Sequence, residues 1–226
     1  MTAKIIAVYN QKGGCGKTMT TMQLGGAIGL RGYRSMVVDM DPQNTAVTWS
    51  SIAEEATPFP ARVISLASQF ESMVKEVRKF VHDVDVILID CPPAIESMVP
   101  WAALLMADLG LIPVSPVMDN IWASKTACDL GIRAKVENKD LKLAYLVSMT
   151  RRGKIFNSCL GVLRKNGKIP VLASTVSLRN AFPESQAWGA TVHTLGKGTP
   201  ATNEIEALTS EVLGILRMEE RKNGQT

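Results

Sequence analysis

Short apolar runs alternate with longer amphipathic stretches along most of this chain. The runs are continuous and rich in Val, Ile and Leu, which is typical of strands buried on both faces of a parallel sheet. The runs predicted to be strands are Lys4–Tyr9, Ser35–Asp39, Arg62–Ser65, Val84–Asp90, Leu109–Val114, Leu141–Met149 and Val171–Thr175. The stretches predicted to be helices are Lys17–Leu30, Thr45–Ala53, Ser68–Val81, Ser97–Met106, Ile121–Ala134, Lys154–Asn166 and Ala201–Met218. This alternation predicts a doubly wound α/β fold, in which helices flank a mostly parallel sheet.

The chain has 226 residues, of which 46% are hydrophobic, so it can bury a substantial core. No internal repeat, low-complexity stretch or long linker interrupts the pattern. We therefore expect residues 1–226 to form a single domain. Because the first predicted strand begins at Lys4, we expect neither a signal peptide nor an N-terminal helix-turn-helix domain.

Two further features suggest a cytoplasmic protein. No apolar run reaches the roughly 18 residues that a membrane-spanning helix needs. The four cysteines lie far apart without a C-x-x-C pair, which argues against a zinc site and fits a reducing compartment.

The segment Lys12–Thr18, which reads KGGCGKT, connects the first predicted strand to the first predicted helix. Its three glycines let backbone N–H groups approach an anion closely, and the helix start adds positive potential. Lys17 can reach the β- and γ-phosphates of a nucleotide, and the Thr18 hydroxyl can bind Mg²⁺. The usual G-x-x-x-x-G-K-[ST] pattern is incomplete, because Gln11 stands where its first glycine belongs and a second lysine, Lys12, follows.

Carboxylates end two other predicted strands. Asp39 and Asp41 form a D-x-D pair after the second strand, and Asp90 ends the strand that reads VILID. In open α/β sheets, sites lie at the carboxyl ends of the strands. Asp90 therefore resembles the acid of a Walker B strand, which binds Mg²⁺ through water, and the D-x-D pair can orient a water or a metal-bound water.

Taken in order, these motifs resemble those of the ParA/MinD family of P-loop ATPases with a deviant Walker A loop, most of all the short ParA-type partition ATPases. The matching segments are Lys12–Thr18, VVDMDPQ at 37–43, VILIDCPP at 86–93, LIPVSP at 111–116 and SLRNAFPESQAWGATV at 177–192. The resemblance runs from about Lys4 to the last predicted helix. It implies ATP and Mg²⁺ as cofactors.

The resemblance also implies roles for individual residues. Lys12 is expected to reach across an ATP-bound homodimer to the partner's nucleotide, and Lys17 to be the P-loop lysine. Asp41 is expected to position the attacking water. The expected metal-site residues are Thr18, Asp39 and Asp90. The expected nucleotide contacts are Lys12, Gly13, Gly14, Cys15, Gly16, Lys17, Thr18 and Met19, with Pro113 and Pro116 near the adenine. Met19 replaces a second threonine that is usual in the family, so its hydroxyl contact is absent while its backbone N–H remains.

Charge is distributed unevenly. Residues 1–120 hold 9 Lys and Arg against 12 Asp and Glu, whereas residues 121–226 hold 16 against 9. The basic segment 133–179 holds 11 Lys and Arg against only Glu137 and Asp140. Such a segment suits sequence-independent contacts with phosphates, and an ordinary solvated surface is the alternative interpretation. Because relatives bind DNA non-specifically as ATP dimers, the residues expected to contact double-stranded DNA are Arg151, Arg152, Lys154 and Arg179.

The resemblance implies an ATPase for plasmid or chromosome partition. It would be cytoplasmic and nucleoid-associated, and a ParB-like or small centromere-binding adaptor would stimulate its hydrolysis. One alternative is a ParA-like ATPase that positions a protein cargo, and another is a nucleotide-dependent metal-cluster carrier. A membrane anchor is not expected, because the chain ends in a polar stretch of mixed charge without Phe or Trp.

Overall fold

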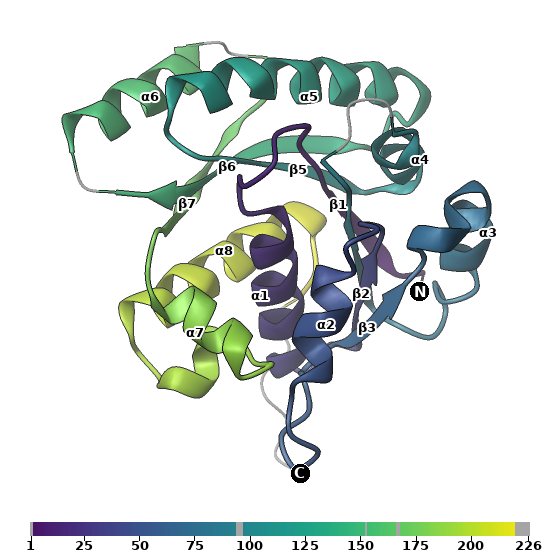
Figure 1. Ribbon diagram of the computed structural model, residues 1–226. Coiled ribbons are helices and arrows are strands. Elements are labelled where there is room, and N and C mark those ends of the chain that lie inside the picture. Colours follow the sequence, from purple (N-terminus) through teal and green to yellow (C-terminus); the bar gives the residue numbers. More distant parts are fainter. Residues whose placement is uncertain (1, 94–96, 152, 166–167, 220–226) are drawn as a thin grey trace.

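The computed structural model describes residues 2–93, 97–151, 153–165 and 168–219 (Figure 1). One sheet of seven strands has the order β3-β2-β4-β1-β5-β6-β7, and every pairing in it is parallel. The strands are β1 Lys4–Val8, β2 Ser35–Asp39, β3 Arg62–Ser65, β4 Val86–Asp90, β5 Leu109–Val114, β6 Lys142–Thr150 and β7 Val171–Ser177. The predicted α/β fold with a parallel sheet is confirmed.

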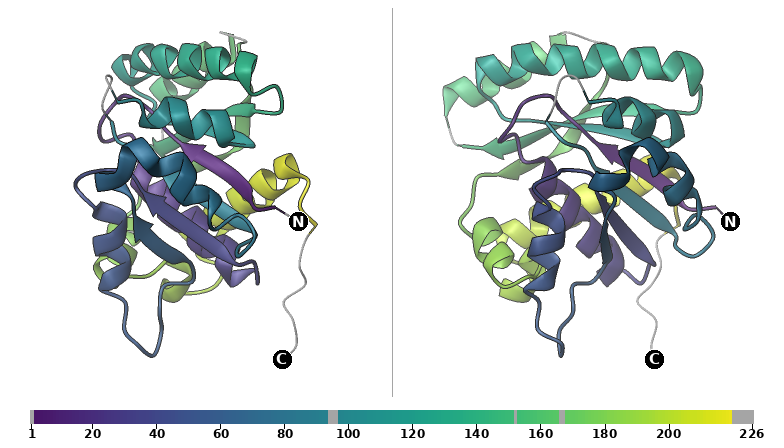
Figure 2. Two further views of the ribbon diagram at one scale, coloured as in Figure 1. Left: turned by 90° about the vertical axis from the view of Figure 1, so that its right-hand side faces the viewer. Right: turned by 45° about the vertical axis from the view of Figure 1, so that its right-hand side comes forward.

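Helices cover both faces of the sheet (Figures 1 and 2). The helices packed on one face are α1 Lys17–Leu30, α2 Thr45–Ser51, α7 Ala181–Ala187 and α8 Pro200–Leu216. Those on the other face are α3 Met73–Arg78, α4 Val99–Met106, α5 Met118–Glu137 and α6 Lys154–Lys165. Among the described helices, none is both long and apolar enough to cross a membrane.

Each face of the sheet has its own hydrophobic core. Successive side chains of a strand point to opposite faces, so Ile5 and Ala7 of β1 belong to one core while Ile6 and Val8 belong to the other. β2 and β4 are likewise buried along their whole length. This double burial explains why the strands read as continuous apolar runs in the sequence.

The order of the strands places a switch point at β1, which lies between β4 and β5. Asp90, the last residue of β4, is in register with both Val8 of β1 and Asp39 of β2. The ends of these three strands therefore meet at one edge of the sheet. Ligands of open α/β sheets bind outside the carboxyl ends of the strands at such a point.

Some predicted elements differ from the structure. The single helix predicted over 68–81 is wrong, because a 3₁₀ segment at Ala67–Ser72, kinked at Gln69, precedes the short α3. α7 and the 3₁₀ turn η2 at Val192–Leu195 were not predicted. α5 extends beyond the predicted Ile121–Ala134 at both ends.

Candidate nucleotide-binding site

The loop between β1 and α1 has the backbone of a phosphate cradle. Gly14 has a φ of 69° and Gly16 a φ of 87°, a left-handed backbone conformation that residues other than glycine rarely adopt. A side chain added at Gly13 or Gly14 would meet no atom within 4 Å, so the space above the loop is open. α1 begins directly after Gly16, and the first N–H groups of a helix have no partner within it. The loop therefore offers free N–H donors to an anion.

Lys17 places a positive charge under this loop. Its side chain is buried, and its Nζ atom donates a hydrogen bond to the carbonyl oxygen of Lys12 at 3.1 Å. Within the described part of the chain, Lys17 forms no ion pair. A buried ammonium group with a carbonyl partner is suited to an incoming phosphate. Lys12 itself is exposed at the front of the loop.

Asp90 lies beside the start of α1 and is held by two threonines. Thr18 donates to its Oδ2 atom at 2.6 Å, and Thr21 donates to its Oδ1 atom at 3.2 Å. Burial raises the pKa of Asp90 to about 7, and the nearby charge of Asp39 adds to the rise. A cation here would be stabilised, and hydroxyl and carboxylate oxygens are ligands that Mg²⁺ accepts. The predicted metal residues Thr18 and Asp90 therefore meet, and they fit the ion.

Thr21 was not predicted as a site residue. It lies one helical turn after Thr18, so the two hydroxyls share a face of α1. The three-residue spacing of the two threonines is visible in the sequence. It indicates a site residue only when Asp90 is known to lie opposite both hydroxyls.

Asp39 has a structural role in this site. Its Oδ1 atom accepts the N–H of Asp41 at 3.0 Å, and its Oδ2 atom accepts the N–H groups of Ala46 and Val47 at 2.9 and 3.2 Å. Burial raises the pKa of Asp39, although these hydrogen bonds oppose the rise. Asp39 thus fixes the start of α2 and the loop that carries Asp41.

Asp41 and the β5 loop flank the cradle. The Asp41 side chain is partly exposed, and its Oδ1 atom accepts the N–H of Gln43 at 3.0 Å. Asn10 reaches from the cradle to β5, where its Nδ2 atom donates to the carbonyl oxygen of Pro113 at 2.8 Å. Pro116 follows two residues after β5 ends. The side chain of Met19 lies over Gly16, 3.4 Å from the position that a Cβ atom would take there.

The cysteines lie within the core. Cys15, Cys91, Cys128 and Cys159 are buried and form no disulfide. Burial raises the pKa of the Cys15 thiol, which disfavours thiolate chemistry in the loop. Within the described residues, no group of three or more His, Cys, Asp or Glu side chains could hold a metal ion.

The four residues predicted to contact DNA differ in exposure and in their partners within the chain. Arg151 is exposed directly after β6, whereas Arg152 and the side chain of Lys154 lie outside the described residues. Arg179 donates from its Nε and NH2 atoms to Oε1 of Glu204 at 3.1 and 2.6 Å. The same carboxylate accepts the N–H and hydroxyl groups of Ser177 at 2.9 and 2.8 Å. The Arg179 charge is therefore already partly neutralised within this chain.

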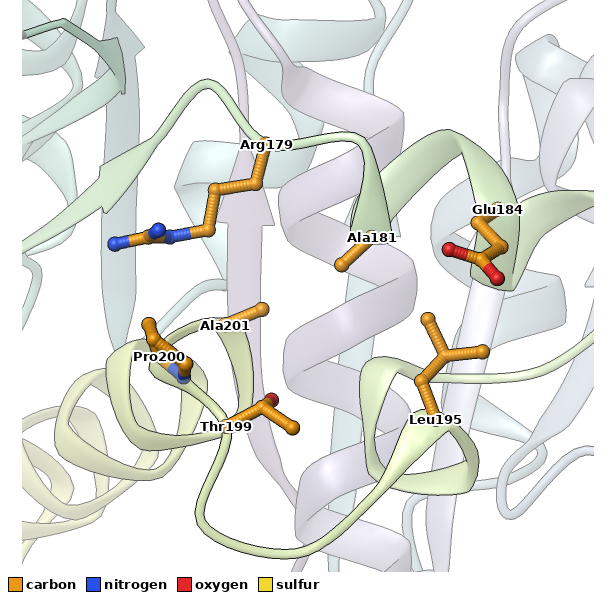
Figure 3. Close-up of a pocket in the computed structure, with 7 residues that line it drawn as sticks. All are labelled: Arg179, Ala181, Glu184, Leu195, Thr199, Pro200 and Ala201. Carbon is orange, nitrogen blue, oxygen red and sulfur yellow. The ribbon is translucent and has the colours of Figure 1, made fainter.

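Figure 3 shows Arg179 at the rim of a pocket beside the start of α8. The pocket has a volume of about 390 Å³ and is lined by Arg179, Ala181, Glu184, Leu195, Thr199, Pro200 and Ala201. Two of the seven lining residues are ionisable, one of each sign. The pocket is therefore not a continuation of the basic segment.

Comparison with known proteins identifies relatives of this chain. The family model described as the CobQ/CobB/MinD/ParA nucleotide binding domain matches residues 6–192. The maintenance of carboxysome distribution protein A of Halothiobacillus neapolitanus is 28% identical over 209 residues, covering 92% of this chain and 95% of that protein. Protein ParA of Rhizobium radiobacter is 27% identical over 199 residues, covering 84% of this chain and 86% of its own.

Solved structures support the same fold. A Cyanothece McdA variant in complex with ATP superposes with a TM-score of 0.76 and 14% identity, covering 99% of both chains. The septum site-determining protein MinD of Pyrococcus horikoshii, in complex with Mg-ADP, gives a TM-score of 0.72 at 17% identity, covering 93% of this chain and 96% of its own. With its fold, its phosphate loop and the match over residues 6–192, the chain belongs to the ParA/MinD family and is an ATPase of that family.

Proposed function

We propose that this ATPase positions a protein assembly in the cell, through ATP-dependent dimerisation and reversible binding to DNA. The observation that carries the proposal is the match over 92% of the chain to a protein named for maintaining carboxysome distribution. That relative has nearly the same length, because 95% of it is covered. The cargo is thus proposed to be a protein body of a comparable kind.

Nucleotide binding would use the loop and the buried charges beneath it. Lys17 would leave the Lys12 carbonyl oxygen and contact the β- and γ-phosphates, while the free N–H groups of the loop bind phosphate oxygens. Thr18 and Asp90 would hold Mg²⁺, which neutralises phosphate charge when bound. Thr21 would keep Asp90 oriented when Thr18 turns to the metal.

Dimerisation and hydrolysis are assigned to the two residues exposed at the edge of the cradle. Lys12 lies at the front of the loop, outside the buried position that Lys17 fills, so its ammonium group can reach a nucleotide on a second copy. Asp41 would orient the attacking water, and Asp39 would hold the loop that carries it. Hydrolysis would then separate the dimer.

DNA binding is assigned to exposed basic residues of the second half of the chain, which are Arg151 after β6, Arg164 and Lys165 on α6, and Arg133 on α5. A dimer would present two copies of each residue, and the contacts would be made with phosphates rather than with bases. The location implied is the nucleoid.

Partition of a plasmid or chromosome is the second candidate function, with a centromere-binding adaptor as partner. Protein ParA of Rhizobium radiobacter favours it, because that match covers 84% of this chain. In this case the DNA cargo would be carried by the adaptor rather than by the ATPase alone.

A plasmid retention assay separates the two functions. The gene and its neighbours are placed on a low-copy plasmid without partition genes, and retention is counted over many generations without selection. We expect no gain in retention over the same plasmid carrying Lys17→Ala. A clear gain in plasmid retention that Lys17→Ala abolishes would contradict the protein cargo and would support a DNA cargo.

A further inference from the structure

β6 is irregular at the end that faces the nucleotide site. Val147 of β6 pairs with Thr175 of β7, and Thr150 pairs with Ser177, so three steps along β6 are matched by two along β7. β6 therefore contains one extra residue in this interval, as in a β-bulge. Met149 lies within it with a φ of 55°, a conformation that is uncommon for residues other than glycine.

The bulge lies directly beside a buried contact with the phosphate loop. The Ser148 hydroxyl donates a hydrogen bond of 2.7 Å to the carbonyl oxygen of Cys15, 133 positions earlier in the chain. Ser148 is 0% exposed, so water does not compete for this bond. Bulges next to functional sites redirect a side chain, and here the redirected hydroxyl reaches the loop.

The bond fixes one peptide group of the loop. The peptide between Cys15 and Gly16 is planar and trans, so its carbonyl oxygen and its N–H point in opposite directions. Holding the carbonyl oxygen against β6 therefore turns the Gly16 N–H away from β6. The φ of 87° at Gly16 continues the chain into α1, whose first N–H groups are also free.

The start of the loop is fixed in a similar way. Asn10 is buried, and its Oδ1 atom accepts the N–H of Lys12 at 3.2 Å while its Nδ2 atom donates to Pro113 of β5. Two neighbouring strands, β5 and β6, thus hold the loop before any nucleotide arrives. Preorganisation of this kind lowers the entropic cost of binding.

We propose that Ser148 is a positioning residue of this ATPase, which holds the Cys15–Gly16 peptide in the orientation that binds phosphate. The proposal rests on nucleotide binding at the loop, as proposed above. Ser148 touches the loop and not the reacting atoms, so its loss weakens nucleotide binding and leaves the chemical step intact. A merely structural serine would lower stability without this selective effect.

The test compares Ser148→Ala with wild type by calorimetric titration with ATP and with ADP, and by steady-state hydrolysis. We expect the Kd of both nucleotides and the KM to rise by about 3- to 10-fold, the usual effect of one buried hydrogen bond. We expect kcat to stay within about twofold, because the contact supports binding equally in the ground state and in the transition state. The near-isosteric Ser148→Cys, a weaker donor, should give an intermediate Kd.

Ser124→Ala is the matched control. Ser124 is also buried, and its hydroxyl donates a bond of the same 2.7 Å length to the carbonyl oxygen of Ile121, but within α5. Nucleotide affinity equal in Ser148→Ala and Ser124→Ala would overturn the proposal, and so would unchanged affinity in Ser148→Cys if Ser148→Ala does not fold. Wild-type protein that binds no nucleotide would instead contradict the nucleotide site itself.

Discussion

At the scale of single residues, the candidate site separates buried charged groups from charged groups at its edge. Lys17 and Asp90 are buried at the base of the loop, where a charge interacts strongly with a ligand because water is excluded. Lys12 and Asp41 lie at its edge, where they can meet a water or a second chain. We therefore propose that Lys17 and Asp90 bind the nucleotide and its metal, whereas Lys12 and Asp41 serve dimerisation and hydrolysis.

Replacing Lys17 tests the binding role. We expect Lys17→Ala to weaken ATP binding by about 100-fold or more, because the phosphates lose their buried cation. Isothermal titration with ATP measures the effect, and Lys79→Ala is the control, since Lys79 lies directly after α3 and pairs with Glu76 on the exposed surface. A loss of tenfold or less would contradict the assigned role of Lys17.

Replacing Asp41 tests the hydrolytic role. We expect Asp41→Ala to bind ATP with wild-type affinity and to hydrolyse it about 100-fold more slowly, since a positioned carboxylate typically contributes that much. The change should leave the fold intact, because Asp39 rather than Asp41 accepts the N–H groups that begin α2. Phosphate release and ATP binding are measured for wild type and for Asp41→Ala. Equal turnover in the two proteins would contradict a hydrolytic role for Asp41.

At the scale of the elements, the sequence predicted the strands well because each is a continuous apolar run ending at a turn. α7 escaped prediction since it is short and contains Pro183, which a first helical turn tolerates. Ser148, Thr21 and the α2-capping role of Asp39 also escaped. The contacts of Ser148 and Thr21 span 133 and 69 positions, and local pattern carries no signal for contacts of that kind. The contacts of Asp39 span only seven and eight positions, but they depend on how the loop between β2 and α2 turns back.

One element-level contact gives a clear dependence on pH. Glu206 of α8 accepts hydrogen bonds from Arg31 at the end of α1, the shorter at 2.6 Å, and contacts His193 of η2 at 2.7 Å. Burial alone would raise the pKa of Glu206, but these two partners lower it below its usual value. The contact therefore stabilises the fold when the carboxylate is ionised, and this contribution is lost as pH falls through the lowered pKa.

We accordingly expect Glu206→Gln to lower the free energy of unfolding by about 1 kcal/mol at pH 7, since the pair is partly screened by solvent. The difference from wild type should shrink as the pH falls below the ordinary glutamate range. Urea unfolding at pH 7 and at about pH 3, below the ordinary glutamate pKa, measures both values. A difference that grows toward acid pH would have the wrong sign and would contradict the linkage.

At the scale of the whole molecule, one edge of the sheet carries the candidate nucleotide site, and Arg151 follows β6 directly at that edge. Arg151 is exposed, whereas Arg179 is engaged by Glu204 and contributes to the joint between β7 and α8. The structure therefore makes Arg151 the sharper probe of DNA binding. From the sequence, Arg179 is the first residue to test, because the family resemblance places a DNA-contacting basic residue just after the STVSL segment. The sequence cannot show that Glu204 lies beside Arg179.

We expect Arg151→Glu to weaken binding of random-sequence duplex DNA by about tenfold per dimer in the presence of ATP, and to leave ATP hydrolysis without DNA unchanged. Binding should also fall steeply with salt, by a log–log slope of about −0.9 for each phosphate contact. Mobility shifts across a salt series measure both effects, with Lys79→Glu directly after α3 as the charge-matched control. Equal DNA affinity in Arg151→Glu and Lys79→Glu would contradict a DNA contact at Arg151 and would support the interpretation as an ordinary solvated surface.

The proposed function requires that ATP join two copies of this chain through Lys12, and light scattering measures the mass of the dimer. Wild type and Lys12→Ala are measured with ADP and with a slowly hydrolysed ATP analogue, after titration shows that both bind nucleotide. The account predicts twice the mass of one chain only for wild type with the analogue, and the mass of one chain in the other three samples. A wild type that stays at the mass of one chain, or a Lys12→Ala protein that still doubles, would contradict it.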